Sequence, residues 1–186
     1  VNFLSTWDEF EKTAPPEQQL HYYAIEKHPL SVSDIQKHSQ HNAHLEKLLS
    51  LYPMRVEGWH TIRLSARVTL TLIFDTVERA LPEMQTQVHC WILNSHRPAE
   101  NLFQHIKRLS TTGTRVVANI ADSKNDLEKI GFTVTTKDNE LSAIFNHGTS
   151  PLLIKKNKPE KIAIIGGGIA GAALAYMLSL RGCAVT

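Results

Sequence analysis

Apolar residues recur at the three- and four-residue spacing of a helix in four segments of the chain. The first, Asn2 to Lys12, is followed by the helix-breaking pair Pro15 and Pro16. Its apolar positions are Phe3, Leu4, Trp7 and Phe10. The other predicted helices are Ser33 to Leu51, Asn101 to Leu109 and Ser123 to Ile130. Ser33 suits the N-cap of the second helix, and Gly131 suits the C-terminal boundary of the last.

Between these helices lie short runs with the composition or two-residue alternation of strands. The clearest alternation places Val68, Leu70 and Leu72 against threonines, which predicts a hairpin with one buried face. The run Val88 to Leu93 is apolar throughout, as in central strands. The predicted strands are Leu20 to Glu26, Trp59 to Leu64, Val68 to Phe74, Val88 to Leu93, Thr114 to Ile120, and an antiparallel pair, Phe132 to Thr136 with Leu141 to Asn146.

Strands that alternate with helices predict an α/β fold, a mostly parallel sheet with helices on both faces. The polar stretch 155–160 is read as a linker. We therefore expect one domain over residues 1–154 and the start of a second over residues 161–186. Because the chain opens at Val1 and stops at Thr186 within an apparent strand, we expect it to be an excerpt of a longer protein.

Composition adds few constraints to this picture. Of 186 residues, 42% are hydrophobic and 20% charged, as in ordinary globular proteins, and the formal charge of +2 is too small to indicate nucleic-acid binding by itself. Two distant cysteines, Cys90 and Cys183, with no secretory signal and no apolar run of membrane-spanning length, favour a cytoplasmic protein. We expect a monomer that does not enter membranes.

Glycines at 166, 168 and 171 match the G-x-G-x-x-G fingerprint of dinucleotide-binding folds. A buried strand, Ile162 to Ile165, is predicted just before them, and a helix, Ala172 to Leu180, just after. The first glycine allows the tight turn, the second lets the backbone approach a pyrophosphate, and the third lets the helix pack close to the strand. The helix N-terminus then offers free N–H groups to the phosphates.

The alternative is a purely structural glycine turn without a ligand. The extra Gly167 and the Gly168-Ile-Ala-Gly171 form resemble flavin oxidoreductases of the D-amino-acid-oxidase type more than nicotinamide dehydrogenases. FAD is therefore the expected cofactor, and its predicted binding residues are Gly166, Gly167, Gly168, Ile169, Ala170 and Gly171. The acidic residue that would hold the ribose, about 20 residues further on, lies past Thr186.

The order of several short stretches resembles the bifunctional tRNA 5-methylaminomethyl-2-thiouridine biosynthesis proteins (MnmC type) over nearly the whole chain. These stretches are Asn2-Phe-Leu4 with Trp7, Ile25-Glu-Lys-His-Pro-Leu30, Arg67-Val-Thr-Leu70 with Phe74, Trp91-Ile-Leu93, Asn101-Leu-Phe103, Gly131-Phe132 and the glycine run. That family fuses an S-adenosylmethionine methyltransferase to an FAD oxidoreductase. The resemblance implies a Rossmann-like methyltransferase domain that lacks its first strand, followed by the first βα unit of an FAD domain.

The resemblance also implies residue roles. Glu26 takes the place of the carboxylate that accepts hydrogen bonds from the S-adenosylmethionine ribose; the alternative is a solvated surface glutamate. Asn94 stands where the family has an aspartate, and Ser95-His96 replaces Gly-Phe in a loop that is several residues shorter. Since an asparagine cannot accept a proton at neutral pH, the methyltransferase half is expected to be degenerate, and no catalytic residue is assigned in it.

The resemblance implies a parent enzyme that modifies the wobble uridine of tRNA. The FAD half would remove a carboxymethyl group and the methyltransferase half would methylate the exposed amine. Two alternatives stay open: a catalytically dead first domain that docks tRNA or serves as a scaffold, and an FAD amine oxidase acting on a small molecule.

Three histidines at three-residue spacing, His38, His41 and His44, are read as a solvated helix face, so no metal is expected. Trp7, Trp59 and Trp91 are read as core residues.

Overall fold

A computed structural model describes residues 2–38, 42–94, 101–118, 123–137, 140–146, 161–166, 168–180 and 183–186. The expected linker, 155–160, and the expected boundary at residue 154 lie outside these ranges. The helices are α1 (Asn2–Thr13), α2 (Val32–His38), α3 (Leu45–Leu51), α4 (Val77–Glu83), α5 (Leu102–Leu109), α6 (Lys124–Lys129) and α7 (Ile169–Leu180). The strands are β1 (Leu20–Ile25), β2 (Gly58–Arg63), β3 (Val68–Phe74), β4 (Val88–Leu93), β5 (Ser110–Ala118), β6 (Phe132–Lys137), β7 (Glu140–Phe145), β8 (Lys161–Ile162) and β9 (Ala184–Val185).

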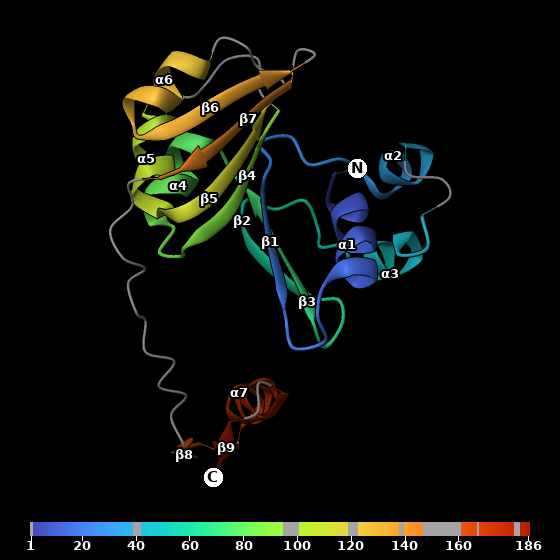
Figure 1. The fold of residues 1–186 in the computed structure, drawn as a ribbon. Coiled ribbons are helices and arrows are strands. Elements are labelled where there is room, and N and C mark those ends of the chain that lie inside the picture. The colour runs from blue at the N-terminus through green and yellow to red at the C-terminus, as the bar shows by residue number, and fades with distance from the viewer. Residues whose placement is uncertain are drawn as a thin grey trace.

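The strands of residues 20–145 form two mixed sheets (Figure 1). One has the order β1-β3-β2 and the other the order β4-β5-β7-β6. Strand β1 is parallel to β3, and β4 is parallel to β5, but the hairpins β2–β3 and β6–β7 and the β5–β7 pair are antiparallel. The predicted mostly parallel sheet is therefore wrong, because the tight connections of two hairpins force antiparallel neighbours.

Helices cover both faces of the β1-β3-β2 sheet. Helices α1 and α3 cover the face that carries Val68, Leu70 and Leu72, so this predicted face is buried, but the prediction of a single buried face is wrong because Thr71 on the other face is buried too. Helix α4 covers the other face, where Ile73 is fully buried against Ala80 and Leu81. Because both faces are covered, β3 is buried along almost its whole length.

The β4-β5-β7-β6 sheet is covered on one face by α5 and α6, which lie on the same side as α4 in Figure 1. Its other face exposes Ile92, Val117 and Ile144 by 38–43%. Strand β4, predicted to be central, is an edge strand of this sheet in the part of the chain that is described. Its neighbour in space is β1: Tyr23 and Ile25 share an apolar cluster with Val88 and Trp91. No strand ladder between β1 and β4 occurs among the described residues.

The predicted helix Ser33 to Leu51 is two helices, α2 and α3. The backbone turns before α3, where the Asn42 side chain accepts a hydrogen bond from the His44 amide at 2.9 Å, an Asx-type turn that competes with a helix. Ser31 rather than Ser33 caps α2, since its hydroxyl accepts from the Asp34 amide at 3.2 Å. His44 is not solvated as predicted, because its ring stacks on Trp7 at 4.0 Å between centroids.

An arginine on α5 joins that helix to α4. Arg108 on α5 donates to the carbonyl oxygens of Leu81 and Met84 at 2.7 and 2.9 Å, which satisfies acceptors at the C-terminal end of α4.

Trp7 is buried and Trp91 is half-buried, but Trp59 is 43% exposed on the edge strand β2, so its predicted place in the core is wrong. None of the helices in the described ranges is long and apolar enough to cross a membrane.

Candidate functional site

The carboxyl end of β1 presents the first group of predicted site residues. The Glu26 amide continues the β1–β3 pairing by donating to the Ile73 carbonyl at 2.9 Å, so the residue is fixed just past the strand. Its side chain is exposed, and Oε1 accepts a hydrogen bond from the His28 amide at 3.2 Å. A carboxylate at this edge of an open α/β sheet is accessible to a ligand.

A surface hollow of about 560 Å³ adjoins this strand end, lined by Lys27, His28, Pro29 and Arg55. The pKa of Tyr52 responds to the charged groups next to this hollow. Burial raises the pKa of the Tyr52 hydroxyl, the negative charge of Glu26 raises this pKa further, and the positive charge of Arg55 opposes the rise. Tyr52 therefore feels a carboxylate and a guanidinium together, and the hollow has cationic walls beside an acidic rim.

Asn94 follows the carboxyl end of β4 and is exposed. Ser95 and His96, which replace the Gly-Phe expected after it, lie outside the described residues. Strands β1 and β4 are neighbours through the cluster of Tyr23, Ile25 and Trp91. Burial raises the pKa of the Tyr22 hydroxyl, and the thiol of Cys90 on β4 raises this pKa further.

The glycine residues lie in a separate strand–turn–helix unit, β8–α7–β9. Gly166 has φ of +120°, which only glycine adopts without strain. A Cβ built on Gly171 would overlap the carbonyl oxygen of Gly166, so the start of α7 touches the turn. A Cβ on Gly168 would meet nothing within 4 Å. These three environments fit the three predicted roles: tight turn, open approach for a phosphate group, and close helix packing.

The other residues assigned to FAD complete this unit. Ile169 and Ala170 open α7, one turn earlier than the predicted helix start, and the Ala172 amide donates to the Gly168 carbonyl at 3.0 Å. Gly167 lies outside the described residues. Ile169 is 93% exposed. The β8 strand is shorter than predicted, but the Ile164 and Thr186 amides extend its pairing with β9 at 2.9 Å.

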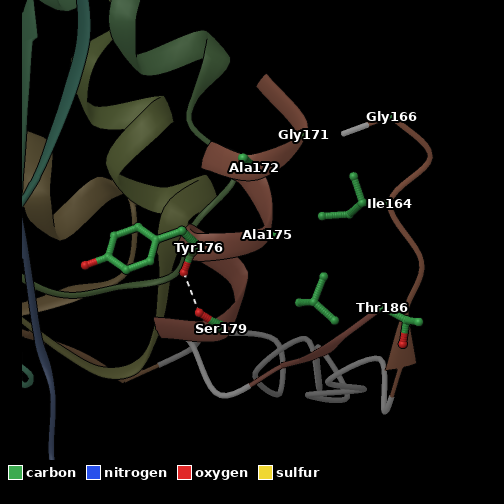
Figure 2. A pocket seen from close by; sticks show the side chains of 9 residues that line it. Ile164, Gly166, Gly171, Ala172, Ala175, Tyr176, Ser179 and Thr186 are labelled. Carbon is green, nitrogen blue, oxygen red and sulfur yellow. Dashed lines mark hydrogen bonds between the residues drawn. The ribbon is translucent and has the colours of Figure 1, made fainter. Parts of the chain in front are cut away.

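A second hollow, of about 430 Å³, lies between α7 and the strand side of this unit (Figure 2). Ile164, Ala172 and Ala175 face it, and Tyr176 and Ser179 lie at its rim, joined by a bond from the Ser179 hydroxyl to the Tyr176 carbonyl at 2.8 Å. Its wall is mainly apolar. Apolar side chains on this helix are expected to pack against further protein rather than against a charged ligand.

Metal ligation finds no support within the described ranges, where no three His, Cys, Asp or Glu side chains come together. His44 lies against α1, with Nε2 3.6 Å from a Glu11 carboxylate oxygen, and His41 lies outside the described residues. Sequence reasoning missed the cationic hollow. The signal was present as Lys27 and His28 directly after a strand end, but Arg55, about 30 residues later, joins them only in the fold.

Comparison with known proteins shows to which family the chain is related. Residues 39–142 match the family model described as S-adenosyl-L-methionine-dependent methyltransferase. Relatives named tRNA 5-methylaminomethyl-2-thiouridine biosynthesis bifunctional protein MnmC are 31% identical to the chain in Hydrogenovibrio crunogenus, 30% in a Marinomonas species and 33% in Magnetococcus marinus. Each match covers the whole chain but 32% of the relative, so the chain spans about a third of the length of these proteins.

Proposed function

The chain belongs to the S-adenosyl-L-methionine-dependent methyltransferase family and is similar throughout its length to MnmC proteins. From this we propose that its parent protein modifies the wobble uridine of tRNA. The observation that carries the proposal is the succession, in one chain, of a methyltransferase-family segment at 39–142 and a strand–glycine–helix unit. The FAD half would remove the carboxymethyl group from a carboxymethylaminomethyl substituent, and the methyltransferase half would methylate the amine left behind.

The fold supports a further strand between β1 and β4, supplied by chain that precedes Val1 in the parent. Leu20 and Glu26 donate their amides toward β3, so the amides of odd-numbered residues such as Tyr23 and Ile25 point toward β4. The partly exposed Ile92 and Val117 lie on the face that such a segment could also cover. Hydrogen exchange tests this: Tyr23 and Ile25 amides should be protected in the parent and fast in residues 1–186. Equal rates would contradict it.

S-adenosylmethionine would be held at the carboxyl edge of β1, with Glu26 accepting hydrogen bonds from the ribose. This assignment fits the geometry, since Glu26 is exposed there and its backbone is fixed by β3. When bound, the cofactor would supply an electrophilic methyl group. Glu26→Gln in the parent should weaken S-adenosylmethionine binding by about tenfold, measured by calorimetry, because an amide is a poorer acceptor than a carboxylate. An unchanged affinity would favour the solvated-glutamate alternative.

FAD would be bound through Gly166, Gly167, Gly168, Ile169, Ala170 and Gly171. The support is the positive φ of Gly166, the open space at Gly168 and the close packing at Gly171. The N-terminus of the 12-residue helix α7 adds a favourable potential for a pyrophosphate. When bound, the flavin would accept the electrons of the oxidation. In this proposal the β8–α7–β9 unit would contribute the phosphate-binding part of the FAD site.

A second candidate function follows from Asn94: the first domain would dock tRNA without transferring methyl groups. Replacing a positioned acid–base group costs about 10²–10⁴-fold in rate. The decisive experiment gives the full-length parent tRNA with carboxymethylaminomethyl-uridine and S-adenosylmethionine, then identifies the nucleosides by mass spectrometry. A methylaminomethyl product supports the first proposal, and an aminomethyl product that accumulates supports the docking function. Unchanged tRNA, with peroxide released from small amines, would favour the amine oxidase.

A further inference from the structure

The cationic hollow beside Glu26 carries charge that binding of S-adenosylmethionine does not use. Its lining includes the ammonium group of Lys27 and the guanidinium group of Arg55. The adenosine end of S-adenosylmethionine, which Glu26 would receive, bears no phosphate and no negative charge. Two cations at this end therefore need another explanation.

These cations are not neutralised by neighbouring carboxylates. Within the described ranges, neither Lys27 nor Arg55 forms an ion pair. Glu26, which directly precedes Lys27, has one carboxylate oxygen occupied by the His28 amide. That bond turns the chain directly after β1, which brings His28 and Pro29 into the wall of the hollow with Lys27. The hollow is therefore a basic depression rather than a set of paired surface charges.

We propose that this hollow binds a phosphodiester of the tRNA backbone, next to the edge where the proposed S-adenosylmethionine site lies. The inference rests on the proposed function, which supplies tRNA as the substrate. Guanidinium and ammonium groups are the side chains that bind phosphate in nucleic-acid complexes. A backbone phosphate fits better than a small free phosphate compound, because Lys27, His28 and Arg55 are all exposed and a shallow hollow cannot enclose a small ligand.

The test measures the salt dependence of RNA binding by the full-length parent. The probe is a fluorescently labelled anticodon stem–loop with a wobble uridine, followed by anisotropy between about 50 and 200 mM KCl. Each lost phosphate contact lowers the slope of log K against log[salt] by about 0.7–0.9. Because both cations would contact the same phosphodiester, Lys27→Gln with Arg55→Gln should reduce the slope by about 0.7–0.9 and weaken binding about tenfold near physiological salt. Lys27→Arg should retain the slope.

Lys47→Gln with Lys137→Gln is the matched control. These exposed lysines lie on α3 and β6 and do not line the hollow, so the same loss of two charges should leave the slope nearly unchanged. An equal slope reduction in both double variants would overturn the proposal, as would wild-type slope in the hollow variant. Inorganic phosphate that binds the wild type calorimetrically, with RNA binding unaffected by the substitutions, would assign a small-phosphate site instead. A parent that binds no RNA at all would instead refute the proposed function, and this inference with it.

Discussion

Arg67 should be among the most important polar residues for the stability of the first domain. It lies in the β2–β3 turn, and its guanidinium donates to three backbone carbonyls in the α1–β1 connection. The bonds are to Ala14 at 3.1 Å, Pro15 at 2.9 Å and Gln18 at 3.1 Å. The guanidinium carbon also lies 4.8 Å from the centre of the Phe10 ring. One side chain thus joins the end of α1 to the hairpin.

The size of the effect follows from these contacts. A hydrogen bond to a charged group contributes about 1.5–3 kcal/mol when it is shielded, and a cation–π contact about 0.5–1 kcal/mol when it is exposed. Because Arg67 is half-buried, its carbonyl partners recover much of their hydration when it is removed. We expect Arg67→Ala to cost about 3 kcal/mol and Arg67→Lys about half of that, since an ammonium cannot reach three carbonyls in the fork geometry.

Hydrogen exchange of the β1 amides in the full-length parent measures this cost. Since 1.4 kcal/mol corresponds to a factor of ten, Arg67→Ala should accelerate exchange in β1 by roughly a hundredfold. Arg79→Ala is the control, because Arg79 pairs with Glu57 and Asp75 on the surface, where such pairs contribute about 1 kcal/mol or less. If Arg67→Ala accelerated exchange no more than Arg79→Ala, the bridging role would be refuted.

Three further predictions concern other parts of the chain. Gly168→Ala should leave the α7 unit folded, because the added Cβ meets nothing within 4 Å. The purified parent should nevertheless be largely colourless, because the Cβ would stand where the backbone is proposed to approach the FAD pyrophosphate. An equally yellow variant would contradict the FAD assignment. Gly131→Ala should lower the melting temperature of the first domain, because Gly131 has φ of +105° and a Cβ there would lie 3.1 Å from the Phe145 ring. The backbone strain alone should lower the free energy of unfolding by about 1–2 kcal/mol. An unchanged melting temperature would show that the turn relaxes. Burial raises the pKa of the Cys90 thiol, so a smaller fraction of this thiol is in the reactive thiolate form at pH 8–9. Alkylation of Cys90 should therefore be slower than alkylation of free cysteine, and the difference in rate should shrink as the pH rises. Equal rates at pH 8 would refute the shift.

The sequence predicted the elements well where local pattern determines them. The alternation of Val68, Leu70 and Leu72 identified one of the two buried faces of β3, and the apolar spacing in Asn2 to Lys12 identified α1. Gly131 ends α6 with positive φ, as its position indicated. In each case neighbours within a few residues settle the conformation, so no tertiary information was needed.

The failures have tertiary or side-chain causes. The apolar run of β4 predicted a central strand, but strand position depends on which partners pair with it, and β4 pairs only with β5 in the described part of the chain. The break between α2 and α3 depends on the Asn42 side chain. Among candidate sites, the strand–glycine–helix unit was predictable because its residues are consecutive in the sequence. The hollow was not predictable, because Lys27 and Arg55 are far apart in the sequence and come together only in the fold.

The two sheets are built from stretches of chain that do not interleave. Strands β1 to β3 come from residues 20–74, and β4 to β7 come from residues 88–145. Each sheet therefore closes its ladders within its own stretch of chain, with separations of at most 48 residues, as between Leu20 and Val68. We expect these two stretches to behave as two cooperative folding units, joined by the apolar cluster that they share. Ribosomal synthesis would release the 20–74 unit first, and the α4–α5 contact, fastened by Arg108, would dock the second unit onto it.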